Sequence, residues 1–263
     1  MKLVVGIPAL GQNETLQKNI DLLIANADNK PTIVVWDNGS EIAIPQDDTK
    51  YTLIRSEKNV GVPKAMNNIM EAVEADYYMM IHSDVEIYEK GWDTILIETI
   101  KEINSGDKKV GVIGGYGSMQ MGADDINITP YNKWQVGRAY NMAGNKIRLP
   151  REHGFKEFPG IYFPCITLDG YWLTVKSDIR FWDNAPHHMY DHDVCMESID
   201  KGYTNWTLNI DHDHQGGVSV CRENWTRDFQ YTGDEIHDLA SSEFYNKWKH
   251  KLPMKHESII SYY

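Results

Sequence analysis

The first 113 residues predict an α/β fold built on a mostly parallel β-sheet that is flanked by helices. Short apolar runs rich in β-branched residues alternate with longer segments whose apolar residues recur every three or four positions. Polar clusters follow two of these runs, at 37–40 and at 82–86. Strands that alternate with helices form right-handed βαβ units, and such sheets bind ligands beyond the carboxyl ends of their strands. We therefore expect the polar clusters to lie at a binding edge.

Each element of this part is predicted from its own pattern. The strands, which share nearly continuous apolar runs, are expected at 2–7, 32–36, 51–55, 76–81 and 110–113. The helices, which share an apolar face, are expected at 13–25, 64–75 and 92–103. In the first helix, for example, Leu16, Ile20 and Leu23 fall on one side.

Beyond residue 113 the pattern is less regular. Residues 114–158 have little periodicity, and a loop of this length is uncommon unless it binds something or moves. Strand fragments are expected within 161–174 and at 205–210, and helices at 194–200 and 234–249. We expect one domain over 1–263, divided into a regular part (1–113), an irregular part (114–223) and a C-terminal helical extension (224–263).

Composition narrows the class of protein. Hydrophobic residues make up 41% of the chain and charged residues 24%, as in ordinary folded proteins. A net charge of −12 disfavours nucleic acids and anionic membrane surfaces as partners. A nucleic-acid partner is therefore disfavoured, although the charge does not exclude one.

Several features favour a cytoplasmic location. The longest apolar runs, such as 77–81 and 161–166, are too short to span a bilayer. The first residues are apolar only briefly, as expected for a strand and not for a signal peptide. The three cysteines have unrelated spacings, so we expect free thiols in a reducing compartment.

Four short motifs in the first part carry possible chemistry. The first strand ends in Ile7-Pro8-Ala9, and the second ends in the turn Asp37-Asn38-Gly39-Ser40. A glycine-containing loop, 59–67, enters a helix where backbone N–H groups can face a phosphate. The fourth strand ends in His82-Ser83-Asp84.

Taken in this order, the motifs resemble those of the family-2 glycosyltransferases. The resemblance covers residues 3–90 and resumes at 168–219. It implies the GT-A fold, a Rossmann-like α/β arrangement, with 1–113 as the nucleotide-binding half and 114–223 as the acceptor and catalytic half. It also implies a nucleotide-diphosphate sugar as donor, uridine being the family's commonest base.

The resemblance assigns roles in donor binding. Asp37 matches the acid that hydrogen-bonds the base, and Asp84 matches the last acid of the DxD-type motif, which holds Mg²⁺ or Mn²⁺ between the phosphates. His82 stands where that motif has its first acid. A neutral imidazole there can hydrogen-bond the ribose or shift the preference toward Mn²⁺. The full set assigned to nucleotide-sugar binding is Pro8, Ala9, Asp37, Asn38, Asn59, Gly61, Lys64, Asn67, His82, Ser83 and Asp84.

The second half supplies the acceptor side. The segment containing Asp169, Gly170 and Trp172 resembles the wall of the sugar and acceptor pocket, although Trp172 on its own fits a buried core equally well. Asp191 matches the general base, which must take a proton from a weakly nucleophilic hydroxyl. Tyr190 stands where the family usually has Glu, and Asp193 is expected to be structural.

A histidine pair completes the resemblance. The segment 211–219 resembles the family's H-x-G-G-x-S motif, whose His reaches the metal or the diphosphate. The spacing to Gly216 and Gly217 selects His214 as a metal ligand, with His212 as the second choice. On a strand the two imidazoles would share a face.

The sequence therefore predicts an inverting, metal-dependent glycosyltransferase that moves a sugar to a carbohydrate or another hydroxyl acceptor. Two alternatives stay open. One is a catalytically silent sugar- or nucleotide-sugar-binding protein, which the departures at His82 and Tyr190 allow. The other is a different nucleotide-dependent transferase, although the loop after the first strand lacks the Lys or Arg that a nucleotidyltransferase would need.

Overall fold

The computed structural model describes residues 1–11, 13–122, 135–137, 140–141, 149–150, 161–184, 187–215, 226, 228–230 and 232–257. Gly216, Gly217 and most of the long irregular segment expected at 114–158 lie outside these residues.

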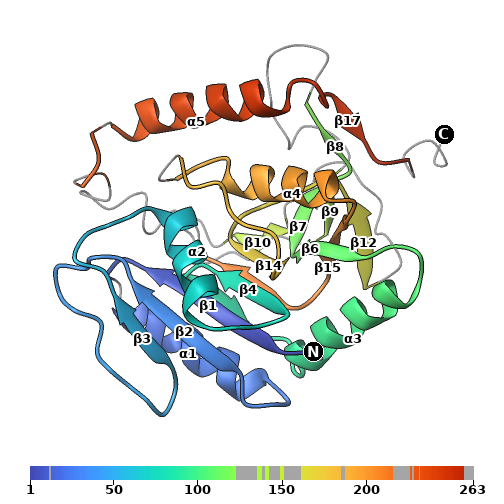
Figure 1. Ribbon diagram of the computed structural model, residues 1–263. Coiled ribbons are helices and arrows are strands. Elements are labelled where there is room, and N and C mark those ends of the chain that lie inside the picture. Colours follow the sequence, from blue (N-terminus) through green and yellow to red (C-terminus); the bar gives the residue numbers. More distant parts are fainter. Residues whose placement is uncertain are drawn as a thin grey trace.

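A single eight-stranded sheet passes through the middle of the molecule (Figure 1). Its order is β12-β15-β6-β14-β4-β1-β2-β3. The strands are β1 (Leu3–Ala9), β2 (Thr32–Asp37), β3 (Thr52–Arg55), β4 (Tyr77–Ile81), β6 (Val110–Gly114), β12 (Tyr162–Cys165), β14 (Trp172–Lys176) and β15 (Thr204–Leu208). Strands from both predicted halves of the chain are therefore joined in one sheet.

The sheet is mostly parallel, with β14 antiparallel in its interior and β12 antiparallel at one edge. Parallel pairing joins β4, β1, β2 and β3, and also β15 and β6. Strand β14 lies antiparallel between β4 and β6, so its first residue, Trp172, pairs with the last residue of β4, Ile81. This pairing brings the segment ahead of β14 to the carboxyl edge of the parallel strands.

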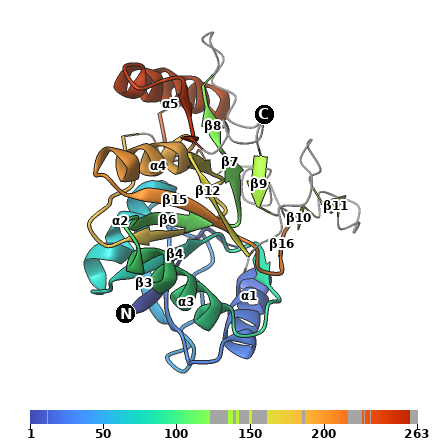
Figure 2. The ribbon, with the colours of Figure 1, turned by 90° about the vertical axis from the view of Figure 1, so that its right-hand side faces the viewer.

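The helices cover both faces of the sheet. The elements are α1 (Asn13–Asn26), α2 (Val62–Ala72), α3 (Trp92–Ser105), α4 (Tyr190–Asp200) and α5 (Gly233–Trp248). Residues of α1 and α3 belong to one core cluster, and residues of α2 and α4 belong to another. Figure 2 shows α1 and α2 on opposite sides of the sheet. None of the described helices is both long and apolar enough to cross a membrane.

Smaller sheets complete the described part of the chain. One has the order β11-β10-β16-β5, with β5 (Val85–Ile87), β10 (Tyr140–Asn141), β11 (Leu149–Pro150) and β16 (His212–His214). Another has the order β13-β7-β9, with β7 (Tyr116–Ser118), β9 (Gln135–Gly137) and β13 (Thr167–Leu168). A third pairs β8 (Gln120–Met121) with β17 (Met254–Lys255).

Helix α5 is attached to α4 through a buried carboxylate. The Asp193 side chain is 1% exposed and accepts hydrogen bonds from Lys247 Nζ at 2.9 and 3.0 Å and from Trp248 Nε1 at 2.7 Å. Figure 1 shows α5 lying alongside α4. Asp193 thus has the structural role predicted for it, although its partners belong to a distant helix.

We expect Asp193→Ala to lower the free energy of unfolding by about 2 kcal/mol, because the buried Trp248 indole N–H loses its acceptor. Asp193→Asn keeps an acceptor oxygen, so its free energy of unfolding should fall by less. Urea unfolding of the two variants measures the difference. Equal losses would show that the hydrogen bond to Trp248 does not stabilise the contact between the helices.

Candidate active site

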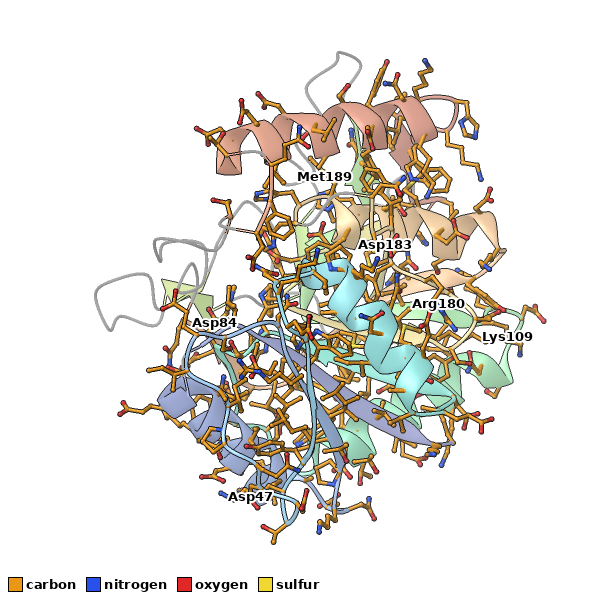
Figure 3. The ribbon with its side chains drawn as sticks, turned by 60° about the vertical axis from the view of Figure 1, so that its left-hand side comes forward. Asp47, Asp84, Lys109, Arg180, Asp183 and Met189 are labelled. Carbon is orange, nitrogen blue, oxygen red and sulfur yellow. The ribbon has the colours of Figure 1, made fainter. Side chains whose placement is uncertain are left out.

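Several of the predicted site residues lie at the carboxyl edge of the parallel strands. Ala9 and Asp37 end β1 and β2, and His82 directly follows β4. In Figure 3 Asp84 lies at one end of the sheet, and Lys109, which precedes β6, lies at the other. The topology therefore brings together motifs that are far apart in the sequence.

Three side chains at this edge form a possible metal site. Ligand atoms of His82, Asp84 and His214 all lie within 4.8 Å of one another. Strand β16, which carries His214, pairs with β5 immediately after Asp84, with His214 opposite Val85. His214 Nε2 is 3.5 Å from Asp84 Oδ1. Two imidazoles and one carboxylate are a donor set that fits a divalent cation.

The electrostatics of the group suit a cation. Burial alone would raise the pKa of Asp84, but the hydrogen bond from His214 and the charges of His214 and His82 bring it below its usual range. Burial lowers the pKa of His82 to about 4, although Asp84 opposes this shift. Near neutral pH the group therefore presents an ionised carboxylate beside a neutral His82 imidazole.

His212, the second choice of metal ligand, makes its contacts within the core. Its Nε2 is 2.9 Å from the Tyr171 hydroxyl, and its Nδ1 is 2.8 Å from the Ile210 carbonyl oxygen. The side chain is fully buried. His212 and His214 do share a face of β16, since both stack on Tyr171 with ring centroids 5.5 and 4.8 Å away. Both ring nitrogens of His212 have partners within the core, and His212 is not in the described metal group.

Asp191 lies in the first turn of α4, facing the loop before β14. Its Oδ2 accepts the Gly170 N–H at 3.1 Å, and its Oδ1 lies 2.7 Å from His192 Nδ1. Burial would raise the pKa of Asp191, but the charge and hydrogen bonds of His192 lower it on balance. A Cβ atom at Gly170 would lie 2.6 Å from the Tyr190 hydroxyl and 3.0 Å from Asp191 Cβ. Glycine is therefore required for this close approach.

Helix α4 begins earlier than the sequence predicts, at Tyr190 instead of 194. His188 and Met189 precede it with φ values of 66° and 54°. Left-handed backbone at residues other than glycine is uncommon and concentrates at functional sites. The turn brings Asp191 into the first turn of the helix, where the helix dipole stabilises a carboxylate.

Trp172 does not line a pocket. Its side chain is 0% exposed, within the main core cluster, and its ring is 5.5 Å from that of His212. Trp172 therefore has the buried core position that the sequence left open as the alternative to the pocket wall. Asp169 is only partly buried, and its backbone N–H donates to the Tyr116 carbonyl. Its role in acceptor binding stays a prediction.

Asp37 organises the turn after β2. The fully buried carboxylate accepts the Ser40 N–H at 2.9 Å, the Ile44 N–H at 3.3 Å and Arg55 Nη1 at 2.5 Å. Gly39 makes the turn possible, with φ of 78° and with the backbone of Lys58 so close that a Cβ atom would lie 2.4 Å from it. Whether Asp37 also reaches a base stays a prediction.

The glycine-containing loop is attached to this turn. Asn38 Nδ2 donates to Asn59 Oδ1 at 2.7 Å, and Asn38 Oδ1 accepts the Val60 N–H at 2.9 Å. Asn59 Oδ1 also accepts the Gly61 N–H at 2.9 Å. Gly61 caps α2 without a side-chain hydrogen bond. The amide side chains therefore fix the loop that leads into the first turn of α2.

The remaining predicted donor-site residues have varied surroundings. Asn67 exchanges two hydrogen bonds with the backbone of Phe181, at 2.8 and 3.0 Å, so its amide links α2 to the segment after β14. Lys64 is exposed on the first turn of α2. Pro8 is partly buried, the Ala9 carbonyl accepts the Asn38 N–H at 2.8 Å, and Ser83 is buried.

Sequence reasoning missed a second cluster beside the metal group. Glu86 is buried and accepts Lys18 Nζ and Gln215 Nε2, each at 2.6 Å. The Gln215 backbone N–H donates to the Asp84 carbonyl at 3.0 Å. The strand that carries His214 is thus fixed to the strand after Asp84. The signal available in the sequence was a carboxylate two positions beyond Asp84.

His187 should make the fold sensitive to acid. Burial, with a contribution from His188, lowers the pKa of His187 to about 3. The unfolded chain therefore binds a proton near pH 6.5 that the folded chain does not, and stability falls as the pH drops through this window. Between pH 7 and 4.5 we expect His187→Gln to lose less stability than the wild type, by on the order of 2 kcal/mol. Urea titrations at both pH values test this, with the exposed His250→Gln as control.

A family profile described as a glycosyltransferase-like family matches residues 37–231. The chain belongs to this glycosyltransferase-like family. It is a sugar-transferring enzyme of the family-2 type, and its fold is the GT-A fold. No curated protein matches the sequence.

Solved structures of S. aureus TarS share the fold. TarS 1–349 matches with a TM-score of 0.51 and 15% identity, over 96% of this chain and 73% of that one. The same fragment in complex with UDP-GlcNAc matches with a TM-score of 0.57 and 16% identity, over 94% of this chain and 67% of that one. Its complex with UDP matches with a TM-score of 0.53 and 14% identity, over 96% of this chain and 73% of that one.

Proposed function

We propose that this enzyme transfers a sugar from a nucleoside-diphosphate donor to an acceptor hydroxyl, with inversion at the anomeric carbon and with a divalent cation. The observation that carries the proposal is the meeting of two groups at one edge of the sheet. Tyr190, adjacent to Asp191, lies with its hydroxyl 2.8 Å from Nε2 of His82 in the Asp84 group. This contact, together with the influence of the Asp191 charge on the pKa of His82, supports a carboxylate base and a cation-binding group at one site.

Asp84 and His214 would hold the cation, Mn²⁺ or Mg²⁺. When bound, it would supply positive charge to the diphosphate of the donor and of the departing nucleotide. Two protein ligands leave coordination positions for phosphate oxygens, as is usual for such ions. The fixed loop from Asn59 to Gly61 leads to the start of α2, which no side chain caps, and this arrangement supports binding of the phosphates nearby.

Asp191 would act as the general base. Each carboxylate oxygen has more than one acceptor position, so the bonds from Gly170 and His192 orient the group and leave room for a further donor. The ionised carboxylate takes the proton of the acceptor hydroxyl as that oxygen attacks the anomeric carbon. Attack on the face opposite the leaving nucleotide gives inversion, by the opposed-face logic of inverting glycosidases.

UDP-sugars are the first donors to test, because a solved relative of the same fold holds UDP-GlcNAc. The assay measures release of free UDP from a panel of UDP-sugars with Mn²⁺, Mg²⁺ or EDTA, with and without simple sugar acceptors. We expect metal-dependent UDP release from at least one donor. Absence of release and of donor binding across UDP-, GDP- and dTDP-sugars would refute the proposed function.

A further inference from the structure

Two positions that depart from the family pattern contact each other. His82 stands in place of an acid, and so does Tyr190, and 108 residues separate them. In the folded protein His82 Nε2 is 2.8 Å from the Tyr190 hydroxyl. The two replacements therefore form one structural unit at the active site.

We propose that His82 is a third protein ligand, making with Asp84 and His214 a two-imidazole, one-carboxylate centre that selects first-row transition cations over Mg²⁺. Tyr190 is its positioning residue. This inference rests on the proposed function in one respect, the expectation that the site holds a divalent cation. Binding of that cation is tested without any nucleotide.

The geometry supports a common ion. The ligand atoms of the three side chains already lie within 4.8 Å of one another. The rings of His82 and His214 meet edge to face with centroids 6.0 Å apart, so they do not stack against each other and exclude an ion. Small side-chain rotations would bring the three donors to bonding distance of one cation.

Ligand chemistry decides which cation is favoured. Mg²⁺ prefers oxygen donors in near-ideal octahedral geometry and gives up its water reluctantly. Imidazole nitrogen suits first-row transition ions better, and affinities within that row rise from Mn²⁺ upward. An acid at position 82 would give a site dominated by oxygen, whereas His82 together with His214 gives two nitrogen donors. Even Mn²⁺, at the weak end of that row, should therefore bind more tightly than Mg²⁺.

Tyr190 fixes the orientation of the His82 ring. With its hydroxyl on Nε2, Nδ1 of His82 is the nitrogen left for a cation among the described contacts. Tyr190 is itself held, because its hydroxyl is 3.4 Å from the Gly170 carbonyl oxygen and Gly170 leaves space for it. Partners of this kind set the tautomer of a ligating histidine, and their loss typically lowers metal affinity by about 10–100-fold.

The test is direct binding of metal to the nucleotide-free protein. Free Mn²⁺ is measured by electron paramagnetic resonance during titration, and Mg²⁺ binding is measured by competition. For the wild type we expect Mn²⁺ to bind at least about 100-fold more tightly than Mg²⁺. We expect His82→Asn to lower Mn²⁺ affinity by about tenfold or more while changing Mg²⁺ affinity little, and Tyr190→Phe to lower Mn²⁺ affinity by about tenfold.

Controls separate ligation from folding. His250→Asn, at an exposed position beyond α5, should keep wild-type Mn²⁺ binding. If His82→Asn does not fold, His82→Asp provides a second test, because it should move the preference toward Mg²⁺. If either folded His82 variant had the same ratio of Mn²⁺ affinity to Mg²⁺ affinity as the wild type, the proposal would be overturned. Full Mn²⁺ affinity in Tyr190→Phe would overturn the positioning role.

The outcome is also distinguishable from failure of the proposed function. Selective Mn²⁺ binding that depends on His82, in a protein that neither binds nor hydrolyses any nucleotide sugar, would support the metal inference and refute the transferase proposal. UDP release that proceeds equally with Mg²⁺ and Mn²⁺, together with equal affinities for the two ions, would support the transferase proposal and refute the metal inference.

Discussion

Asp191→Asn should lower the rate of sugar transfer by about 10²–10⁴-fold, the usual contribution of a positioned general base. The amide keeps the size of the carboxylate and can still accept the Gly170 N–H, so the start of α4 should stay folded. It cannot take a proton from the acceptor at neutral pH. Because the loss is in the chemical step, kcat should fall while binding of the donor nucleotide changes little.

The measurement is the steady-state rate of transfer, together with nucleotide affinity by calorimetry. Asp200→Asn is a matched control, since Asp200 ends the same helix and its side chain is 51% exposed. We expect its kcat to equal that of the wild type. Near-normal transfer by a folded Asp191→Asn variant would show that another group is the base.

Asp84→Ala should remove metal-dependent binding of the donor and lower transfer by about 10²–10³-fold. Asp84 is the one carboxylate of the described metal group, and it is buried between the histidines. Without it the site loses its fixed negative charge and the acceptor of the His214 contact. Nucleotide binding in EDTA should be the same for variant and wild type.

Asp107→Asn, at an exposed loop position, is the matched control and should behave as the wild type. Calorimetric titration of UDP in Mn²⁺ and in EDTA separates the metal-dependent part of UDP affinity from the metal-independent part. A variant at Asp84 that retained a Mn²⁺-dependent gain in UDP affinity would place the cation elsewhere.

The sequence predicted the regular part of the fold well because its signals are local. The strands β1 to β4 and β6 and the helices α1 to α3 lie within a few residues of the predicted ranges. Helix α5 was also predicted within one residue at each end, and the structure shows its capping box at Thr232 and Glu235. The pairing of β14 between β4 and β6 was not predictable, because no local pattern specifies an antiparallel insertion.

The candidate site was predicted in position but only partly in detail. Ordered motifs at strand ends place Asp84 and His214 in one group, as the structure shows. The spacing to Gly216 and Gly217 ranked His214 above His212, but alternation fixes only the face that the two side chains share, so the core contacts of His212 were not predictable. Trp172 was ambiguous for the same reason. The contact of His82 with Tyr190 joins elements that only tertiary folding brings together.

The most direct test of the central claim is the melting temperature of the purified protein with UDP in Mn²⁺ and in EDTA. A ligand at about 100 times its dissociation constant adds about 2.7 kcal/mol to stability. For a chain of this size that corresponds to a rise of about 5–10 °C. We predict such a rise with UDP and Mn²⁺, a smaller one in EDTA, and no metal dependence in Asp84→Ala. No rise with any nucleoside diphosphate in either condition, for protein that melts cooperatively, would contradict the assignment of a nucleotide-sugar site.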